Sequence, residues 1–224
     1  VPTSGSTVDN VTGSVTFACT AYASGNTSTF NFGQKPFKYA PPKGFLPLNS
    51  ATARPNKVIA RPDQYVGVVR YTGNGSSNNV TGFRFQPDLV WLKSRGSGYH
   101  FLHDSVRGGT KAWFTNVTDN EYDYSPSGVT SFNSDGFTVN GAYGANYGST
   151  GYVSWCWRAG GNKNTFNIDD VGYSSAAAAG LDGGTITPTG ASVGTKQGFS
   201  IIGYTGTDNA SDTFTHGLTQ KPDL

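Results

Sequence analysis

The run His103-Asp104-Ser105 contains the three side-chain types of a hydrolase triad. In a triad these groups converge within hydrogen-bond distance, whereas consecutive residues of an extended chain point to opposite sides. The spacing therefore favours structural roles, with Asp104 bonding backbone amides of the next turn or pairing with Arg107. His100 and His103 diverge on a strand, and the two further ligands that a zinc ion needs are missing nearby.

Acidic side chains are densest in the run Asp119-Asn120-Glu121-Tyr122-Asp123. Its oxygen atoms suit calcium, but the run lacks the register of an EF-hand, which favours a solvated loop. The same residues, with Asp135 or Asp104, could supply the carboxylate pair of a glycosidase, although nothing in the sequence sets their separation. We therefore predict no catalytic residue, no metal site, no cofactor and no enzymatic activity.

Aromatic side chains are candidates for sugar binding, because sugar rings stack on aromatic faces. The candidates are Trp113, Trp155, Trp157, Tyr99, Tyr122, Tyr124, Tyr143 and Tyr147. The strand tryptophans Trp113, Trp155 and Trp157 are expected to pack in the core instead. Tyr143 and Tyr147 lie in a Gly-rich loop with little else to pack on, so we predict them as the binding residues.

The composition indicates a turn-rich all-β protein, with 31 glycines and 13% charged residues. A net charge of +2 that is spread along the chain predicts no nucleic-acid partner. No run approaches the roughly 18 apolar residues of a membrane span, and no signal peptide is visible. Cys19 and Cys156 are expected to be buried and unpaired.

Alternating apolar residues and turn signals place the strands. The pattern predicts strands over 65–72, 89–93, 99–103, 129–132, 136–140 and 152–158, with a hairpin turn over 133–136. Residues 82–85 and 111–114 are weaker candidates. The apolar run 89–93 suggests a strand covered on both faces. One short helix is expected over 169–179, with Asp169 or Asp170 as its N-cap and Gly180 as its stop.

A long-period repeat sets the expected domain organisation. Tyr71-Thr72-Gly73 recurs as Tyr204-Thr205-Gly206, and Pro87-Asp88-Leu89 recurs as Pro222-Asp223-Leu224. The period is far longer than the roughly 20 to 50 residues of a solenoid and matches a whole domain. We predict an incomplete sandwich over 1–49, a linker over 50–64, a complete module over 65–198 and the first strands of a second copy over 199–224. The sequence is thus expected to be part of a longer chain.

Two segments resemble known families. The run NFGQKPFKYAPPKGFLPL, residues 31–48, is similar to the closing segment of a SPRY domain. Five further motifs resemble an uncharacterised module of tail-fibre and other virion proteins of marine and cyanobacterial phages. They are YTGNG, FQPDLVWLKSR, HDSVRG, SFNSDGFTV and YVSWCWRAGG. The resemblance implies tandem concanavalin-like jelly-roll β-sandwiches on a virion surface and carries no catalytic residues.

The function expected from these features is that of a structural component of a phage virion. It would be a tail or head fibre module that presents loops for host attachment, with other virion proteins and copies of itself, by analogy in a homotrimer, as partners. Membrane insertion is not expected. A lectin-like glycan-binding module of a secreted or surface protein is the alternative, and a depolymerase of surface polysaccharide is a third possibility.

Overall fold

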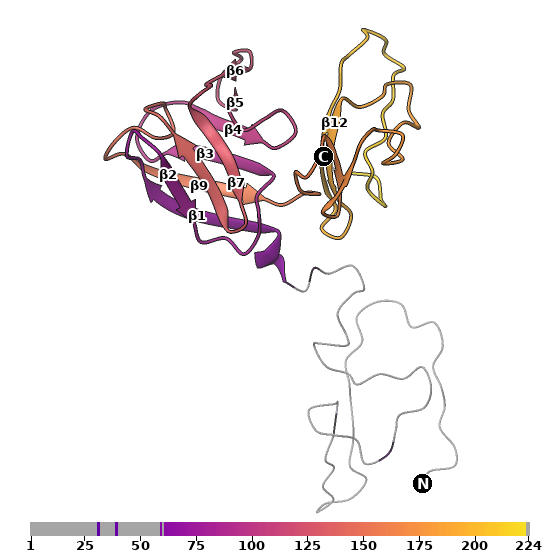
Figure 1. Ribbon diagram of the computed structural model, residues 1–224, viewed down its shortest axis with the longest axis horizontal. Coiled ribbons are helices and arrows are strands. Elements are labelled where there is room, and N and C mark those ends of the chain that lie inside the picture. Colours follow the sequence, from indigo (N-terminus) through magenta and orange to yellow (C-terminus); the bar gives the residue numbers. More distant parts are fainter. Residues whose placement is uncertain (1–30, 32–38, 40–58, 60, 223–224) are drawn as a thin grey trace, which may run out of the picture. The chain divides into compact units, whose positions relative to one another are not determined.

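The computed structural model of the 224-residue chain describes residues 31, 39, 59 and 61–222. The chain divides into two units, residues 1–58 and 59–224. The SPRY-like sandwich and Cys19, both predicted in the first unit, therefore lie outside the described residues apart from Asn31 and Tyr39. The all-β prediction is confirmed, since the described elements are strands apart from the 3-10 turn η1, Pro62–Gln64 (Figure 1).

Two antiparallel sheets form the larger part of the second unit. The first has six strands in the order β1-β9-β3-β4-β5-β6, and the second has three in the order β2-β8-β7. Strands of the first sheet are β1 (Val66–Thr72), β9 (Gly151–Trp157), β3 (Leu89–Ser94), β4 (His100–Asp104), β5 (Lys111–Phe114) and β6 (Tyr122–Asp123). Strands of the second sheet are β2 (Asn78–Thr81), β8 (Gly136–Asn140) and β7 (Gly128–Asn133).

The two sheets bury one face each in a shared core, as in a β-sandwich. The first sheet contributes Leu92, Phe101 and Tyr152, and the second contributes Phe137 and Val139. The aromatic rings interlock, with Tyr71 stacked on Tyr152 at 5.1 Å between centroids. Within the sandwich, the strongly predicted strands agree with the structure, and the weaker candidate 111–114 is β5, but no strand forms over 82–85. The sequence pattern also misses β6 and β2, and the sequence of β2, Asn-Asn-Val-Thr, is largely polar.

Strand β3 is buried on one face only, contrary to the prediction. Val90 and Leu92 are inaccessible to solvent, whereas Leu89 and Trp91 alternate with them on a half-exposed outer face. The apolar run therefore gives a false indication of cover on both faces; on the outer face Trp91 is covered in part by the ring of Trp155, at 5.5 Å between centroids.

The tryptophans do not pack in the core as predicted. On β9 the inward residues are Tyr152, Ser154 and Cys156, which puts Trp155 and Trp157 on the outer face. Ser154 is tolerated inside because its hydroxyl donates to Val69 O at 3.0 Å. Trp113 is 48% exposed. Cys156 is buried and unpaired, as expected.

A smaller four-stranded sheet follows the sandwich in the chain. Its order is β11-β10-β12-β13, made by β11 (Val171–Tyr173), β10 (Phe166–Ile168), β12 (Gly190–Gly194) and β13 (Phe199–Gly203). The sheet packs over its own cluster around Leu181 and Val193. Strand β12 is buried throughout and runs parallel to β10.

The predicted helix over 169–179 is absent from this region. Asp169 and Asp170 have φ values of 48° and 69°, and they form the tight turn between β10 and β11 rather than a helix cap. One helical turn follows, in which Ala179 N donates to Ser175 O at 3.1 Å and Leu181 N closes the turn by donating to Ala176 O at 2.9 Å. Gly180 ends it with a φ of 66°, the left-handed conformation expected of a stop residue.

The two copies of the repeated motif lie in different surroundings. Tyr71 lies in β1 and packs into the sandwich core, whereas Tyr204 follows β13 and stacks on Phe214 at 4.8 Å. Residues 199–203 form β13 of the four-stranded sheet, and Asp223 and Leu224 lie outside the described residues. The predicted second copy stays a prediction.

The buried carboxylate of Asp88 joins the sandwich to the segment that leads into the smaller sheet. Its Oδ2 accepts hydrogen bonds from Ala159 N at 2.7 Å and Gly161 N at 3.1 Å, and its Oδ1 accepts one from Ser105 at 3.0 Å. Ser192 of β12 completes the junction by accepting from Gly160 N at 2.8 Å. Burial raises the pKa of Asp88, and the hydrogen bonds offset part of that rise.

We expect Asp88→Ala to lower the free energy of unfolding by about 3 kcal/mol, because it leaves buried amides without acceptors. Asp88→Asn keeps one acceptor oxygen and should cost less. Urea unfolding measures both.

The pH dependence of the free energy of unfolding, compared between the natural protein and Asp88→Asn, tests whether Asp88 titrates with a raised pKa. A pKa that is higher in the folded protein than in the unfolded chain means that ionisation of Asp88 opposes folding. The protonated carboxyl therefore contributes its full stability below the unfolded pKa, and this stability is lost as pH rises through the folded pKa. The stability of the natural protein relative to Asp88→Asn should therefore fall as pH rises through the acid range. A constant difference would show that Asp88 does not titrate with a raised pKa.

Candidate functional site

An open hollow of about 800 Å³ lies at one end of the sandwich, and we call it the tyrosine cleft. Its rim carries three tyrosines with well-exposed rings, Tyr99 at 46%, Tyr122 at 56% and Tyr147 at 54%. The lining is made by residues 94, 96–99, 101, 122–125, 127, 142–144, 147, 150 and 152. These residues come from the β3–β4 turn with the adjoining ends of both strands, from β6 with the loop after it, and from the β8–β9 loop with the start of β9.

The floor of the cleft is a packed set of aromatic rings. Tyr143 contacts Phe101 at 5.6 Å and Tyr124 at 4.9 Å between centroids. Gly144 lets the loop lie against Phe101, because an added Cβ would be 2.3 Å from Phe101 Cζ. The hydroxyl of Tyr143 has no hydrogen-bond partner in the part of the chain that the structure describes. Burial raises its pKa.

Asn146 holds the loop that carries Tyr143 and Tyr147. The side chain is fully buried, and its Nδ2 donates to Ser76 O at 2.7 Å and to Gly141 O at 3.0 Å. Tyr147 N donates to the hydroxyl of Tyr152 at 3.0 Å. The exposed ring of Tyr147 therefore stands on a backbone that is fixed from both sides.

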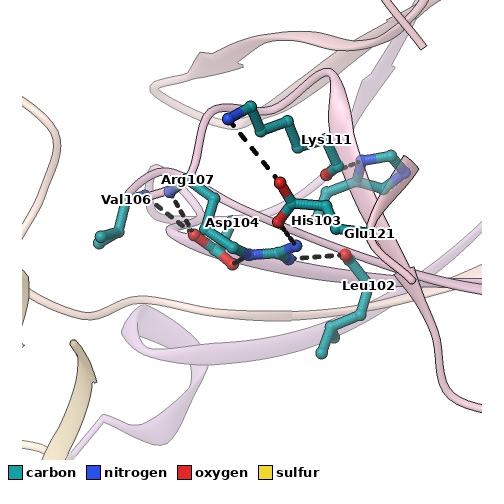
Figure 2. A network of polar contacts seen from close by, with 7 residues as sticks. All are labelled: Leu102, His103, Asp104, Val106, Arg107, Lys111 and Glu121. Atoms are coloured by element: carbon teal, nitrogen blue, oxygen red, sulfur yellow. Dashed lines mark hydrogen bonds and ion pairs between the residues drawn. The ribbon is translucent and has the colours of Figure 1, made fainter. Parts of the chain in front are cut away.

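Arg107 is the centre of a network of polar contacts that includes Glu121, the residue before Tyr122, and Figure 2 shows this network. Its Nε donates to Asp104 at 2.6 Å, its Nη2 to Leu102 O at 2.9 Å and its Nη1 to Glu121 at 2.8 Å. Glu121 immediately precedes Tyr122 in β6. The guanidinium group thus ties the wall that carries Tyr122 to the end of β4.

The triad-like run makes no triad. His103 Nδ1 lies 3.0 Å from Lys111 O, and Ser105 bonds Asp88. Asp104 Oδ1 accepts from Val106 N at 3.0 Å and Arg107 N at 2.8 Å, so the predicted turn and ion pair are confirmed. His100 and His103 lie on opposite faces of β4.

The acidic residues considered for catalysis or calcium are separated. Asp123 lies in the cleft, Glu121 pairs with Arg107, and Asp135 lies in the β7–β8 hairpin. Ser125 N donates to Asp123 at 2.9 Å, which lowers the pKa of this carboxyl and keeps it ionised at neutral pH. No group of three possible metal ligands occurs among the residues that the structure describes.

Both predicted binding tyrosines line the cleft, in different ways. Tyr147 is exposed at the rim, whereas Tyr143 is only 4% exposed and belongs to the floor. Sequence reasoning did not select Tyr99 and Tyr122, the other rim residues. Their positions beside a Gly-Ser turn and in an acidic loop were the available signal, since loop ends of a sandwich commonly carry binding residues.

We expect Arg107→Ala to lower the free energy of unfolding by about 3 kcal/mol, because it strips the buried Asp104 of its cation. Faster hydrogen exchange at the Tyr122 amide should accompany the loss. Arg84→Ala, which removes an exposed arginine, serves as the control. Equal urea midpoints for the Arg107 and Arg84 variants would contradict this role.

His103 should make the fold sensitive to acid. Burial lowers its pKa from 6.5 to about 4. The unfolded chain therefore takes up a proton first, and stability is lost as pH falls from about 6.5 to about 4. The loss should be about 3 kcal/mol. Comparing the pH dependence of unfolding in the natural protein and His103→Gln isolates it, and identical curves would refute the assignment.

Comparison with known proteins adds a family but no named function. Residues 61–224 match the family model described as a domain of unknown function, DUF7483. No curated protein and no solved structure matches the chain. Among the described residues, no helix is long and apolar enough to cross a membrane.

Proposed function

We propose that this chain, which belongs to the DUF7483 family, is a non-enzymatic structural module of a phage virion that attaches to a host-surface glycan through its tyrosine cleft. The module would form part of a tail or head fibre and expose the cleft on the particle surface. Its partners would be other virion proteins and further copies of the chain, by analogy in a homotrimer.

The exposed rings of Tyr99, Tyr122 and Tyr147 around one hollow carry this proposal. The hollow, at about 800 Å³, is of the size that holds a small ligand. Phenol rings offer stacking surfaces to sugar rings, and the Asp123 carboxylate accepts hydrogen bonds from hydroxyls. Because Asn146 and Arg107 fix both walls, little ordering entropy would be lost on binding.

The arrangement of carboxylates supports binding rather than cleavage. Within the described lining, Asp123 is the single carboxylate. Hydrolysis of a glycosidic bond generally uses two carboxylates at a defined separation. Release of reducing sugar from host envelopes would instead favour a depolymerase.

The assignment to a virion rests on the motifs that resemble phage fibre modules. The jelly-roll connectivity and the tandem copies belong to the same proposal, and the all-β sandwich supports them. The alternative is a lectin-like module of a secreted or surface protein, which the cleft favours equally. Immunolabelling of purified particles separates the two placements.

We expect the chain to bind selected glycans on an array, with Tyr147→Ala or Tyr122→Ala weakening binding at least tenfold, because stacking on an aromatic ring is lost. Tyr204→Ala removes an exposed ring elsewhere and should bind like the natural protein. A blank array, or equal losses in all three variants, would count against the glycan site.

A further inference from the structure

A second hollow, of about 450 Å³, adjoins the tyrosine cleft and contains two arginines. Its lining is Arg70, Tyr71, Thr72, Arg95, Gly151 and Tyr152. Tyr152 also lines the cleft, and Arg95 lies in the chain between Ser94 and Gly96, which line it too. The two hollows therefore share a border at Tyr152 and the start of the β3–β4 turn.

Strand β9 brings the two arginines together from distant parts of the sequence. Arg70 lies on β1 opposite Val153 of β9. Arg95 N donates to Gly151 O at 2.8 Å, and an added Cβ on Gly151 would lie 3.3 Å from Arg95 Cδ. The glycine thus leaves room for the Arg95 side chain to lie across the end of β9.

Neither guanidinium group is neutralised within the part of the chain that the structure describes. The ion pairs there involve Arg61, Arg84, Arg107, Lys111 and Arg158. Lys93, a third cation at this edge, donates to Ser94 O at 2.7 Å and Gly96 O at 3.0 Å. Positive charge therefore accumulates beside the cleft. Guanidinium groups bind carboxylate, phosphate and sulfate through paired hydrogen bonds.

We propose that Arg70 and Arg95 form an anion subsite of the tyrosine cleft, so that the bound glycan is an acidic saccharide. This inference rests on the proposed function and names its ligand class. The ionised carboxylate of Asp123 on the β6 wall repels an anion there. The uncharged part of the sugar then stacks at Tyr122, and its carboxylate, phosphate or sulfate group faces Arg95.

The test is an array of uronate, sialylated, sulfated and phosphorylated oligosaccharides, each beside its neutral counterpart, probed with the full chain. Acidic members should bind at least tenfold more tightly than their counterparts. Arg70→Gln and Arg95→Gln should each weaken acidic binding about tenfold and leave neutral binding unchanged. Arg84→Gln removes an exposed arginine elsewhere and should have no effect. Raising the salt concentration should narrow the difference between acidic and neutral members.

A second measurement does not depend on finding the glycan. Titration with sodium sulfate should shift the NMR signals of the Arg70 and Arg95 Nε–H groups more than that of Arg84. Two outcomes overturn the anion subsite and leave the proposed function standing. In the first, acidic and neutral glycans bind equally well. In the second, the arginine variants have no effect while Tyr147→Ala abolishes binding.

Two further results are decisive. If no glycan binds, the proposed function fails, and unshifted Arg70 and Arg95 signals overturn the anion site as well. If single-stranded DNA binds more tightly than every acidic glycan and with the same arginine dependence, the ligand is a nucleic acid and the saccharide assignment is overturned.

Discussion

A buried carboxylate lies at the junction between the two sheet systems of this protein. Asp88 lies at the corner between β2 and β3, where it accepts hydrogen bonds from the segment after β9 and from Ser105 after β4. A charge in this position is costly unless donors surround it, and here the donors belong to segments far apart in the chain. The carboxylate therefore makes the sandwich and the start of the smaller sheet depend on one another.

At the tyrosine cleft, buried polar side chains hold the backbone that carries exposed aromatic rings. A loop rich in glycine has high conformational entropy, and binding to such a loop would be weakened by the cost of ordering it. Asn146 orders this loop already in the folded protein, because its buried amide bonds the segment that follows β1. Arg107 does the same for the β6 wall. Buried polar groups thus hold the segments that carry the aromatic rim, while the rings of Tyr99 and Tyr122 also pack on Phe114 and Tyr124.

On β9, the alternation of side chains along the sequence predicts the wrong buried face. Val153, Trp155 and Trp157 outweigh Tyr152, Ser154 and Cys156 in apolar area, so hydrophobicity alone turns the tryptophans inward. The structure turns them outward, where Trp155 packs on Trp91 at 5.5 Å between centroids. Tyr152 fills the interior beside Tyr71, the small side chains of Ser154 and Cys156 fit the close packing there, and the Ser154 hydroxyl donates to a backbone acceptor.

The sequence by itself determined the all-β class, most strand positions of the sandwich, the β7–β8 hairpin and the pairing of Asp104 with Arg107. These features follow from period-two alternation, turn residues and charges a few positions apart, all of which are local. The tertiary structure alone decided which face of β9 is buried, that the glycine-rich 190–194 is a buried strand, and that Asp169 and Asp170 form a turn. It also gathered Tyr99, Tyr122 and Tyr147 into one cleft and set Arg70 beside Arg95. Such outcomes depend on pairing between distant segments, and the energy of that pairing is not visible in any short stretch of sequence.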